Sequence, residues 1–254
     1  MISPLTTRIQ KARGEGRKAI IPFLTAGFPN KESFFTHLDE LDNNGADIIE
    51  IGIPFSDPAA DGPVVEAASL KALENGVTLA WIMDELIKRK GQYQAEIVLM
   101  GYVNPFFQYG FETLAADAAK AGVAGFIVPD LPLDESAELR NTLKQHGIAL
   151  ISLIGLNTPA KRMKEYARDA EGYVYVVSYM GTTGAAVAFP PELQKTLADA
   201  RAAFDIPLAL GFGISEPAQL TPFGDAIDAV VFGSALLKDI EATGTALNFM
   251  TRWK

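Results

Sequence analysis

Short apolar runs alternate with helix-periodic segments along the whole chain. Eight runs rich in Val, Ile and Leu are typical of strands, and the segments between them have helical periodicity. The predicted strands are residues 19–27, 47–53, 96–101, 124–130, 149–154, 173–178, 207–211 and 229–233. Regular alternation of strands and helices favours a parallel sheet. Eight such units in 254 residues favour closure of that sheet into a barrel.

The predicted fold is therefore α/β, a (β/α)8 TIM barrel with an additional N-terminal helix. The amphipathic segment from Leu5 to Arg13 predicts that first helix, and a last helix is expected from Ser234 towards Lys254. No Pro- or Ser-rich stretch separates the units, and 48% of the residues are hydrophobic. We expect residues 1–254 to form a single TIM-barrel domain with a sizeable core.

The charge and the scarce residue types exclude several functions. The chain has no cysteine, and its two histidines, His37 and His146, are far apart in the sequence. Thiolate chemistry is excluded, and neither a histidine-based metal site nor a Ser-His-Asp triad is expected. The net charge of −9 argues against nucleic acid and anionic membranes as partners. No apolar run reaches the roughly 18 residues of a membrane span, and no apolar signal segment is visible, so we expect a cytoplasmic protein.

One ionisable residue, Glu50, lies inside the second predicted strand. Alternation along the strand places Glu50 on the face opposite Ile49 and Ile51. A carboxylate there loses hydration, so its pKa is expected to rise towards neutrality. Asp61 follows in a loop, just before a helix expected to begin at Pro63. Two carboxyl groups in different surroundings at the carboxyl end of one strand indicate a catalytic pair.

These residues also have plainer interpretations. Glu50 could be a structural carboxylate paired with a buried Lys or Arg, although strands one to four contain no obvious cation. Asp61 could simply cap the following helix. Tyr175 lies in an apolar strand, where a tyrosine belongs to the core more often than to an active site.

Glycine-rich turns follow the seventh and eighth predicted strands, at Gly211–Ser215 and at Gly233–Ser234. In TIM barrels these loops commonly bind phosphate through backbone N–H groups and a helix N-terminus. Neither turn contains Lys or Arg, so we expect N–H dipoles and the Ser234 hydroxyl to hold the anion. The alternative is that these turns need glycine for conformational reasons alone.

Aromatic residues and prolines gather in two further loops expected on the same face of the barrel. These loops are Pro54–Phe55 and Tyr102–Phe107. Exposed there, they would line a substrate pocket or form a partner interface.

Several motifs resemble those of one known family, and they run from the first predicted strand to the eighth. The matching segments are Pro22–Gly27, Ile49–Pro58, Ala60–Pro63, Met100–Tyr102, Asn104–Pro105, Ile127–Pro132, Gly211–Ser215 and Gly233–Ala235. The run Pro-Phe-Ser-Asp-Pro followed by Ala-Asp-Gly-Pro is highly specific. On these residues, nearly the whole chain is similar to the tryptophan synthase alpha subunit family.

The resemblance implies a reaction and an assembly. The reaction is the retro-aldol cleavage of indole-3-glycerol phosphate to indole and glyceraldehyde 3-phosphate, without a cofactor in this chain. The assembly is an α2β2 heterotetramer with a β subunit that carries pyridoxal phosphate. That subunit would receive the indole for the last step of L-tryptophan biosynthesis.

The resemblance also implies roles for individual residues. Glu50 would perform acid–base catalysis, Asp61 would hold the indole N–H, and Tyr175 would orient the substrate. Residues expected to contact the substrate are Phe23, Met100, Ile127, Thr183 and Phe212. Expected phosphate ligands are Gly184, Gly213, Gly233 and Ser234. Residues expected to face the β subunit are Pro54, Asp57, Asn104, Phe107 and Asp130.

Two segments depart from the family pattern. After strand six the family usually has Ser-Arg-x-Gly-Val-Thr-Gly, whereas Ser178–Gly184 reads Ser-Tyr-Met-Gly-Thr-Thr-Gly. After strand five, Gly155–Pro159 replaces the usual Ala-Pro-Thr/Ser-Thr-Pro.

Three alternatives remain open: a stand-alone lyase that releases indole, a regulatory activator of the β subunit, and another phosphate-binding barrel such as a sugar-phosphate isomerase. The intact Glu50 and Asp61 argue against the second, and the segment from Glu50 to Pro63 argues against the third.

Overall fold

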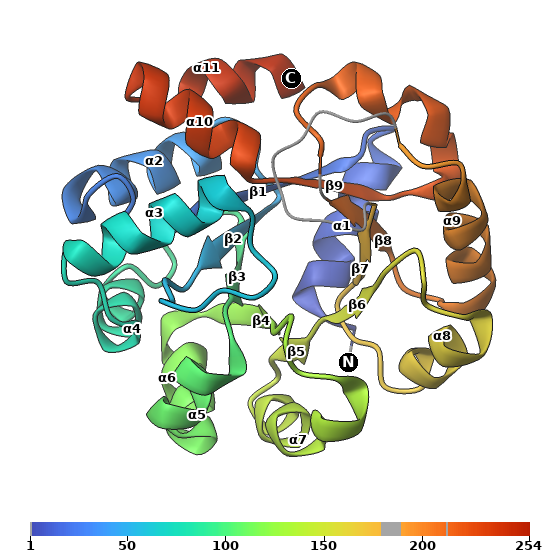
Figure 1. Ribbon diagram of the computed structural model, residues 1–254, viewed down its shortest axis with the longest axis horizontal. Helices are drawn as coiled ribbons and strands as arrows, with labels where there is room; N and C mark the ends of the chain where they lie inside the picture. Colours follow the sequence, from blue (N-terminus) through green and yellow to red (C-terminus); the bar gives the residue numbers. More distant parts are fainter. Residues whose placement is uncertain (1, 179–188, 212) are drawn as a thin grey trace.

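A computed structural model describes residues 2–178, 189–211 and 213–254 (Figure 1). Within these ranges nine parallel strands form one sheet in the order β5-β4-β3-β2-β1-β9-β8-β7-β6. The strands are β1 (Ala19–Thr25), β2 (Ile48–Gly52), β3 (Glu96–Met100), β4 (Val123–Ile127), β5 (Ala149–Leu150), β6 (Ser152–Ile154), β7 (Val174–Val177), β8 (Leu208–Gly211) and β9 (Ala229–Phe232).

The two strands at the ends of this order are neighbours in the chain. Only Ile151 separates β5 from β6, and its N–H donates to the carbonyl of Phe126 in β4 at 2.9 Å. The predicted fifth strand is therefore interrupted at Ile151: its first part pairs with β4 and its second part with β7. Covalent continuity through Ile151 completes the ring, which confirms the predicted TIM barrel.

Helices surround the strands in Figure 1, as expected for parallel strands joined by crossovers. Those of the first half are α1 (Pro4–Gly14), α2 (Lys31–Asn43), α3 (Pro63–Glu74), α4 (Leu79–Lys88), α5 (Val103–Tyr109) and α6 (Phe111–Ala121). Those of the second half are η1 (Leu133–Glu135), α7 (Ala137–Gln145), α8 (Ala160–Ala167), α9 (Glu192–Ala203), η2 (Pro217–Ala226), α10 (Ser234–Thr243), α11 (Leu247–Met250) and η3 (Thr251–Trp253). None of these has the length and apolar character needed to cross a membrane.

Two helical predictions need correction. Residues 103–109 form α5 rather than a loop; Pro105 lies in the first turn of this helix, where its missing N–H costs nothing. The last helix does not continue to the C-terminus. It ends at Gly244, whose φ of 75° stops α10, and two short turns follow.

The barrel interior is filled from its amino end by α1. Leu5 and Ile9 of this helix are fully buried in one cluster with Ile48 of β2 and with Tyr173, which immediately precedes β7. The hydroxyl of Thr6 donates to the carbonyl of Gly172 at 2.5 Å. The N-terminal helix therefore closes the end of the barrel opposite to the carboxyl ends of the strands, and the interior remains accessible from the carboxyl end.

Buried aspartates tie the strands together at the amino end of the barrel. Asp228, which precedes β9, is 3% exposed and accepts the N–H of Leu208 at 2.8 Å. Its carboxylate also pairs with Arg201 at 2.6 Å and with Arg13 at 3.4 Å. The side chain thus links α1, α9 and the start of β8 in one charged network.

Replacing Asp228 by alanine should lower the free energy of unfolding by about 2–4 kcal/mol, because it unpairs two guanidinium groups and a buried N–H. Urea unfolding followed by circular dichroism measures the change. Asp225→Ala is the matched control, since Asp225 is exposed and, among the described residues, its backbone carbonyl alone accepts a hydrogen bond, from Arg201. Equal stability of the two variants would contradict this assignment.

Candidate active site

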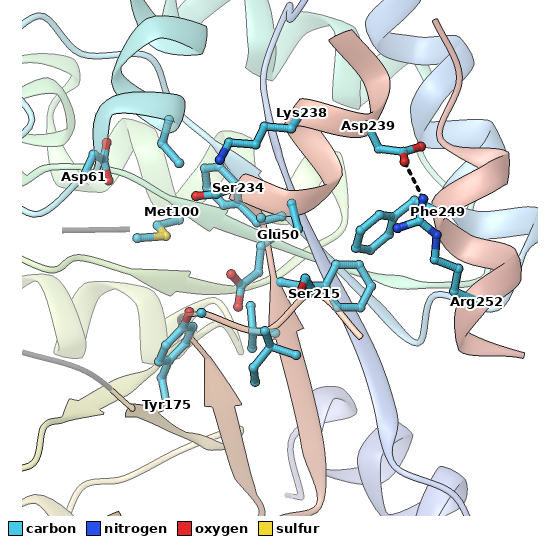
Figure 2. Close-up of a pocket in the computed structure, with 18 of the residues that line it drawn as sticks. Glu50, Asp61, Met100, Tyr175, Ser215, Ser234, Lys238, Asp239, Phe249 and Arg252 are labelled. Atoms are coloured by element: carbon cyan, nitrogen blue, oxygen red, sulfur yellow. Dashed lines mark hydrogen bonds and ion pairs between the residues drawn. The ribbon is translucent and has the colours of Figure 1, made fainter. Parts of the chain in front are cut away.

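A cavity of about 440 Å³ opens at the carboxyl ends of the strands (Figure 2). Five strands contribute side chains: Phe23 from β1, Glu50 from β2, Met100 from β3, Tyr175 from β7, and Val231 with Phe232 from β9. The loops and helices above them contribute Asp61, the turns after β8 and β9, α10 and the C-terminal segment. Side chains that are far apart in the sequence therefore meet where a TIM barrel places its active site.

The structure brings most of the predicted site residues together in this cavity. Those that line it are Phe23, Glu50, Asp61, Met100, Tyr175, Gly213, Gly233 and Ser234. Ile127 does not belong to the lining; its side chain packs in the interior cluster of the barrel. Thr183, Gly184 and Phe212 lie outside the described residues.

Glu50 is a fully buried carboxyl group with a single hydrogen bond. The hydroxyl of Tyr173 donates to its Oε1 at 2.8 Å, while Oε2 has no hydrogen-bond partner among the described residues. No Lys or Arg of the described chain forms an ion pair with it, so the interpretation as half of a buried salt bridge is wrong. Burial raises the pKa of Glu50 to about 8, against a small lowering by the Tyr173 hydrogen bond. The side chain is therefore mostly protonated at neutral pH.

Asp61 does not cap the helix that follows it. The N-cap of α3 is Gly62, which makes no side-chain capping bond. The Asp61 carboxyl instead bonds the hydroxyl of Tyr102, which also accepts the N–H of Ala60 at 3.0 Å. Burial raises the pKa of Asp61 to about 6, and Glu66 adds a smaller repulsion. Asp61 is thus mostly ionised at pH 7, and the two carboxyl groups of one cavity are in opposite protonation states.

Glycines make room for the aromatic rings of the site. A Cβ at Gly52 would lie 2.4 Å from Cζ of Phe23, and one at Gly211 would lie 2.2 Å from Oη of Tyr175. Both distances are far below van der Waals contact, so a larger residue at either position would displace a ring from the cavity wall. Tyr175 is 5% exposed: its ring belongs to the interior cluster and its side chain also lines the cavity.

The turn after β8 is held by one side chain. The Oε1 atom of Gln219 accepts the N–H of Ser215 at 2.7 Å, and its Nε2 donates to the carbonyl of Gly213 at 3.0 Å. Gly213 has a φ of 72°, a left-handed conformation that glycine adopts without strain.

The turn after β9 starts a helix without a side-chain cap. Gly233 is the N-cap of α10 and makes no side-chain bond, so the first N–H groups of this helix lack intrahelical acceptors. The Ser234 hydroxyl is buried and has no partner within the described chain. Free N–H groups, a helix dipole and a hydroxyl donor at one end of the cavity form a suitable site for phosphate.

Two cations at this end of the cavity were not predicted. Lys238 and Arg252 both belong to the lining, although neither lies in the glycine-rich turns. Lys238 follows Ser234 by four residues, so helical periodicity alone places both on one face of α10. Arg252 has no such local signal, because it reaches the cavity from the C-terminal turn.

The residues expected at a partner interface differ in their exposure to solvent. Asp57, Asn104, Phe107 and Asp130 are exposed, whereas Pro54 is buried. Phe107 is 64% exposed, although its ring also packs edge-on against Phe111 with centroids 5.9 Å apart. Asp130 accepts the N–H of Val103 at 2.9 Å and so fixes the start of α5.

Comparisons of the sequence with known proteins all indicate the same family. The family described as tryptophan synthase alpha chain matches residues 9–252. The chain is 61% identical to a tryptophan synthase alpha chain of Solidesulfovibrio magneticus, over 99% of this chain and 98% of the relative. It is also 61% identical to one of Nitratidesulfovibrio vulgaris, again over 99% and 98%.

Solved structures show the same relationship. Tryptophan synthase of Mycobacterium tuberculosis superposes with a TM-score of 0.90 at 31% identity, over 99% of this chain and 96% of that chain. Tryptophan synthase subunit alpha of Legionella pneumophila gives a TM-score of 0.86 at 30% identity, over 98% and 95%. On the barrel, the cavity and these matches, the chain belongs to the tryptophan synthase alpha chain family.

Proposed function

We propose that this chain cleaves indole-3-glycerol phosphate to indole and glyceraldehyde 3-phosphate, as the lyase subunit of tryptophan synthase. The proposal includes a single-domain chain located in the cytoplasm. The observation that carries it is the pair of carboxyl groups: a protonated Glu50 and an ionised Asp61 line one cavity, which ends in a phosphate-type helix N-terminus. A retro-aldol cleavage needs an acid, a stabiliser of positive charge and a base, and these groups supply all three.

Glu50 gives one proton and takes one back. Its carboxyl group protonates C3 of the indole ring, which makes an indolenium cation and leaves Glu50 as a carboxylate. That carboxylate then removes the proton from the hydroxyl on the adjacent side-chain carbon. As a C=O bond forms there, the carbon–carbon bond breaks and its electron pair restores the aromatic ring. The products are indole and an aldehyde, and Glu50 is protonated again.

Asp61 stabilises the cation that forms between these two proton transfers. Its carboxylate accepts the N–H of the indole ring, so the positive charge on that nitrogen develops beside a fixed negative charge. The hydrogen bond from Tyr102 opposes the rise in the Asp61 pKa and keeps the carboxylate in place. Because Asp61 lies in a partly buried loop, this attraction is stronger than it would be in water.

The remaining residues position the substrate. Phe23 and Met100 provide apolar contacts for the indole ring, and Tyr175 orients the substrate next to Glu50. The N–H groups of Gly213 and Gly233, with the Ser234 hydroxyl, bind the phosphate. Binding energy from this remote group holds the scissile bond against Glu50.

The partner in this proposal is the β subunit, in an α2β2 heterotetramer. Its pyridoxal phosphate uses the indole released here, so the cofactor belongs to the partner and none is needed for the cleavage. The exposed aromatic side chain of Phe107 provides an apolar contact at the docking face, and the exposed Asn104 and Asp130 provide polar ones.

Glu50→Gln should lower the rate of indole-3-glycerol phosphate cleavage about 100- to 10,000-fold, because glutamine neither donates nor accepts the transferred proton. Turnover is measured by indole release, and binding of glycerol 3-phosphate should be unchanged. Glu96→Gln is the matched control: Glu96 lies in the neighbouring strand β3, outside the cavity lining. Near-normal turnover of the Glu50 variant would remove this residue from the mechanism.

Cleavage should rise when a β subunit is added, and Phe107→Ala should weaken that stimulation while the isolated chain keeps its activity. Titration of the cleavage rate with β measures both. Leu247→Ala is the control, because Leu247 is 40% exposed on α11 and is not one of the residues expected to face the β subunit. Fast cleavage that does not respond to β would instead identify a stand-alone lyase.

A further inference from the structure

Lys238 is a cation at the phosphate end of the cavity without an opposing carboxylate. In Figure 2 its side chain extends from α10 into the cavity, which Ser234 of the same helix also lines. Within the described chain it forms no ion pair or hydrogen bond, and its side chain is exposed. An extended lysine with no partner in its own chain is available to a ligand.

Arg252, the other cation of the lining, is already paired. Its Nη2 lies 2.7 Å from Oδ1 of Asp239, and its Nη1 lies 3.5 Å from Oε1 of Glu216. Its guanidinium also covers the ring of Phe249, 5.2 Å from the centroid. Two carboxylates thus compensate its charge, which leaves Lys238 as the uncompensated cation among the described lining residues.

The net negative charge of this chain opposes the binding of a phosphate group, so a nearby cation favours it. The chain carries a net charge of −9, and Asp61 adds an ionised carboxylate inside the cavity. A dianionic substrate therefore approaches a repulsive field, which N–H dipoles offset only at short range. A positive group at the cavity entrance reduces that repulsion before the N–H groups make contact.

We propose that Lys238 is a substrate-binding residue whose ammonium group contacts the phosphate bound at the N-terminus of α10. This inference rests on the proposed function and extends it. Lys238 lies one helical turn after Ser234, so both side chains can contact one anion from the same face of the helix. The residue then selects the phosphorylated substrate over indole derivatives that lack the phosphate.

Lys238→Met should raise the KM for indole-3-glycerol phosphate about 3- to 10-fold and change kcat less than about twofold, because the lost contact exists in both ground and transition states. The affinity for glycerol 3-phosphate should fall by the same factor, and the affinity for indole should not change. Lys238→Arg should retain most of the wild-type affinity, because arginine keeps the positive charge. Raising the salt concentration should reduce the difference in KM between the wild type and the methionine variant, because salt screens the attraction between the ammonium group and the phosphate.

Lys161→Met is the matched control, because Lys161 is an exposed lysine of α8 outside the cavity. Unchanged KM and unchanged glycerol 3-phosphate affinity in Lys238→Met would overturn the inference, and so would an equal loss in the control. Failure of the wild-type chain to cleave indole-3-glycerol phosphate is a separate result. It would overturn the proposed function, whereas the binding measurements would still test Lys238 against phosphate esters.

Discussion

The burial of one carboxyl group inside a closed barrel is the constraint on which the site depends. Glu50 has no exposed surface and accepts one hydrogen bond from the described residues, so its ionised form is disfavoured and its pKa rises to about 8. The folded state consequently binds this proton more tightly than the unfolded chain. The resulting stability is complete below the ordinary pKa of 4.5 and is lost as the pH rises through about 8. Burial of Glu50 therefore provides a protonated acid at neutral pH, and it lowers the stability of the fold as the pH rises.

Stability and chemistry occupy opposite ends of the barrel. At the amino end, α1 fills the interior, and Asp47 and Asp228 accept backbone N–H groups and arginines from neighbouring segments. At the carboxyl end, the described cavity contains an unpaired oxygen of Glu50 and an uncapped helix at Ser234. Unsatisfied polar groups at one end are tolerable because well-paired groups at the other end hold the strands in register.

Features that depend on local sequence patterns were predicted from the sequence. Strand–helix alternation was sufficient for the barrel, and strand alternation placed Glu50 inside it. The break at Ile151 was not predictable, because the residues from Ala149 to Ile154 are uniformly strand-like and only pairing with two different neighbours divides them. The Tyr173–Glu50 bond and the approach of Arg252 were missed for a related reason: each joins segments that only the closed barrel brings together.

The most direct test is the titration of Glu50 itself. Carboxyl infrared difference spectra between the wild type and Glu50→Gln isolate this group in the free chain. We expect a protonated carboxyl at pH 7 that ionises with a midpoint near 8. A midpoint near the ordinary value of 4.5 would mean that Glu50 is ionised at neutral pH, and it would contradict its role as the proton donor.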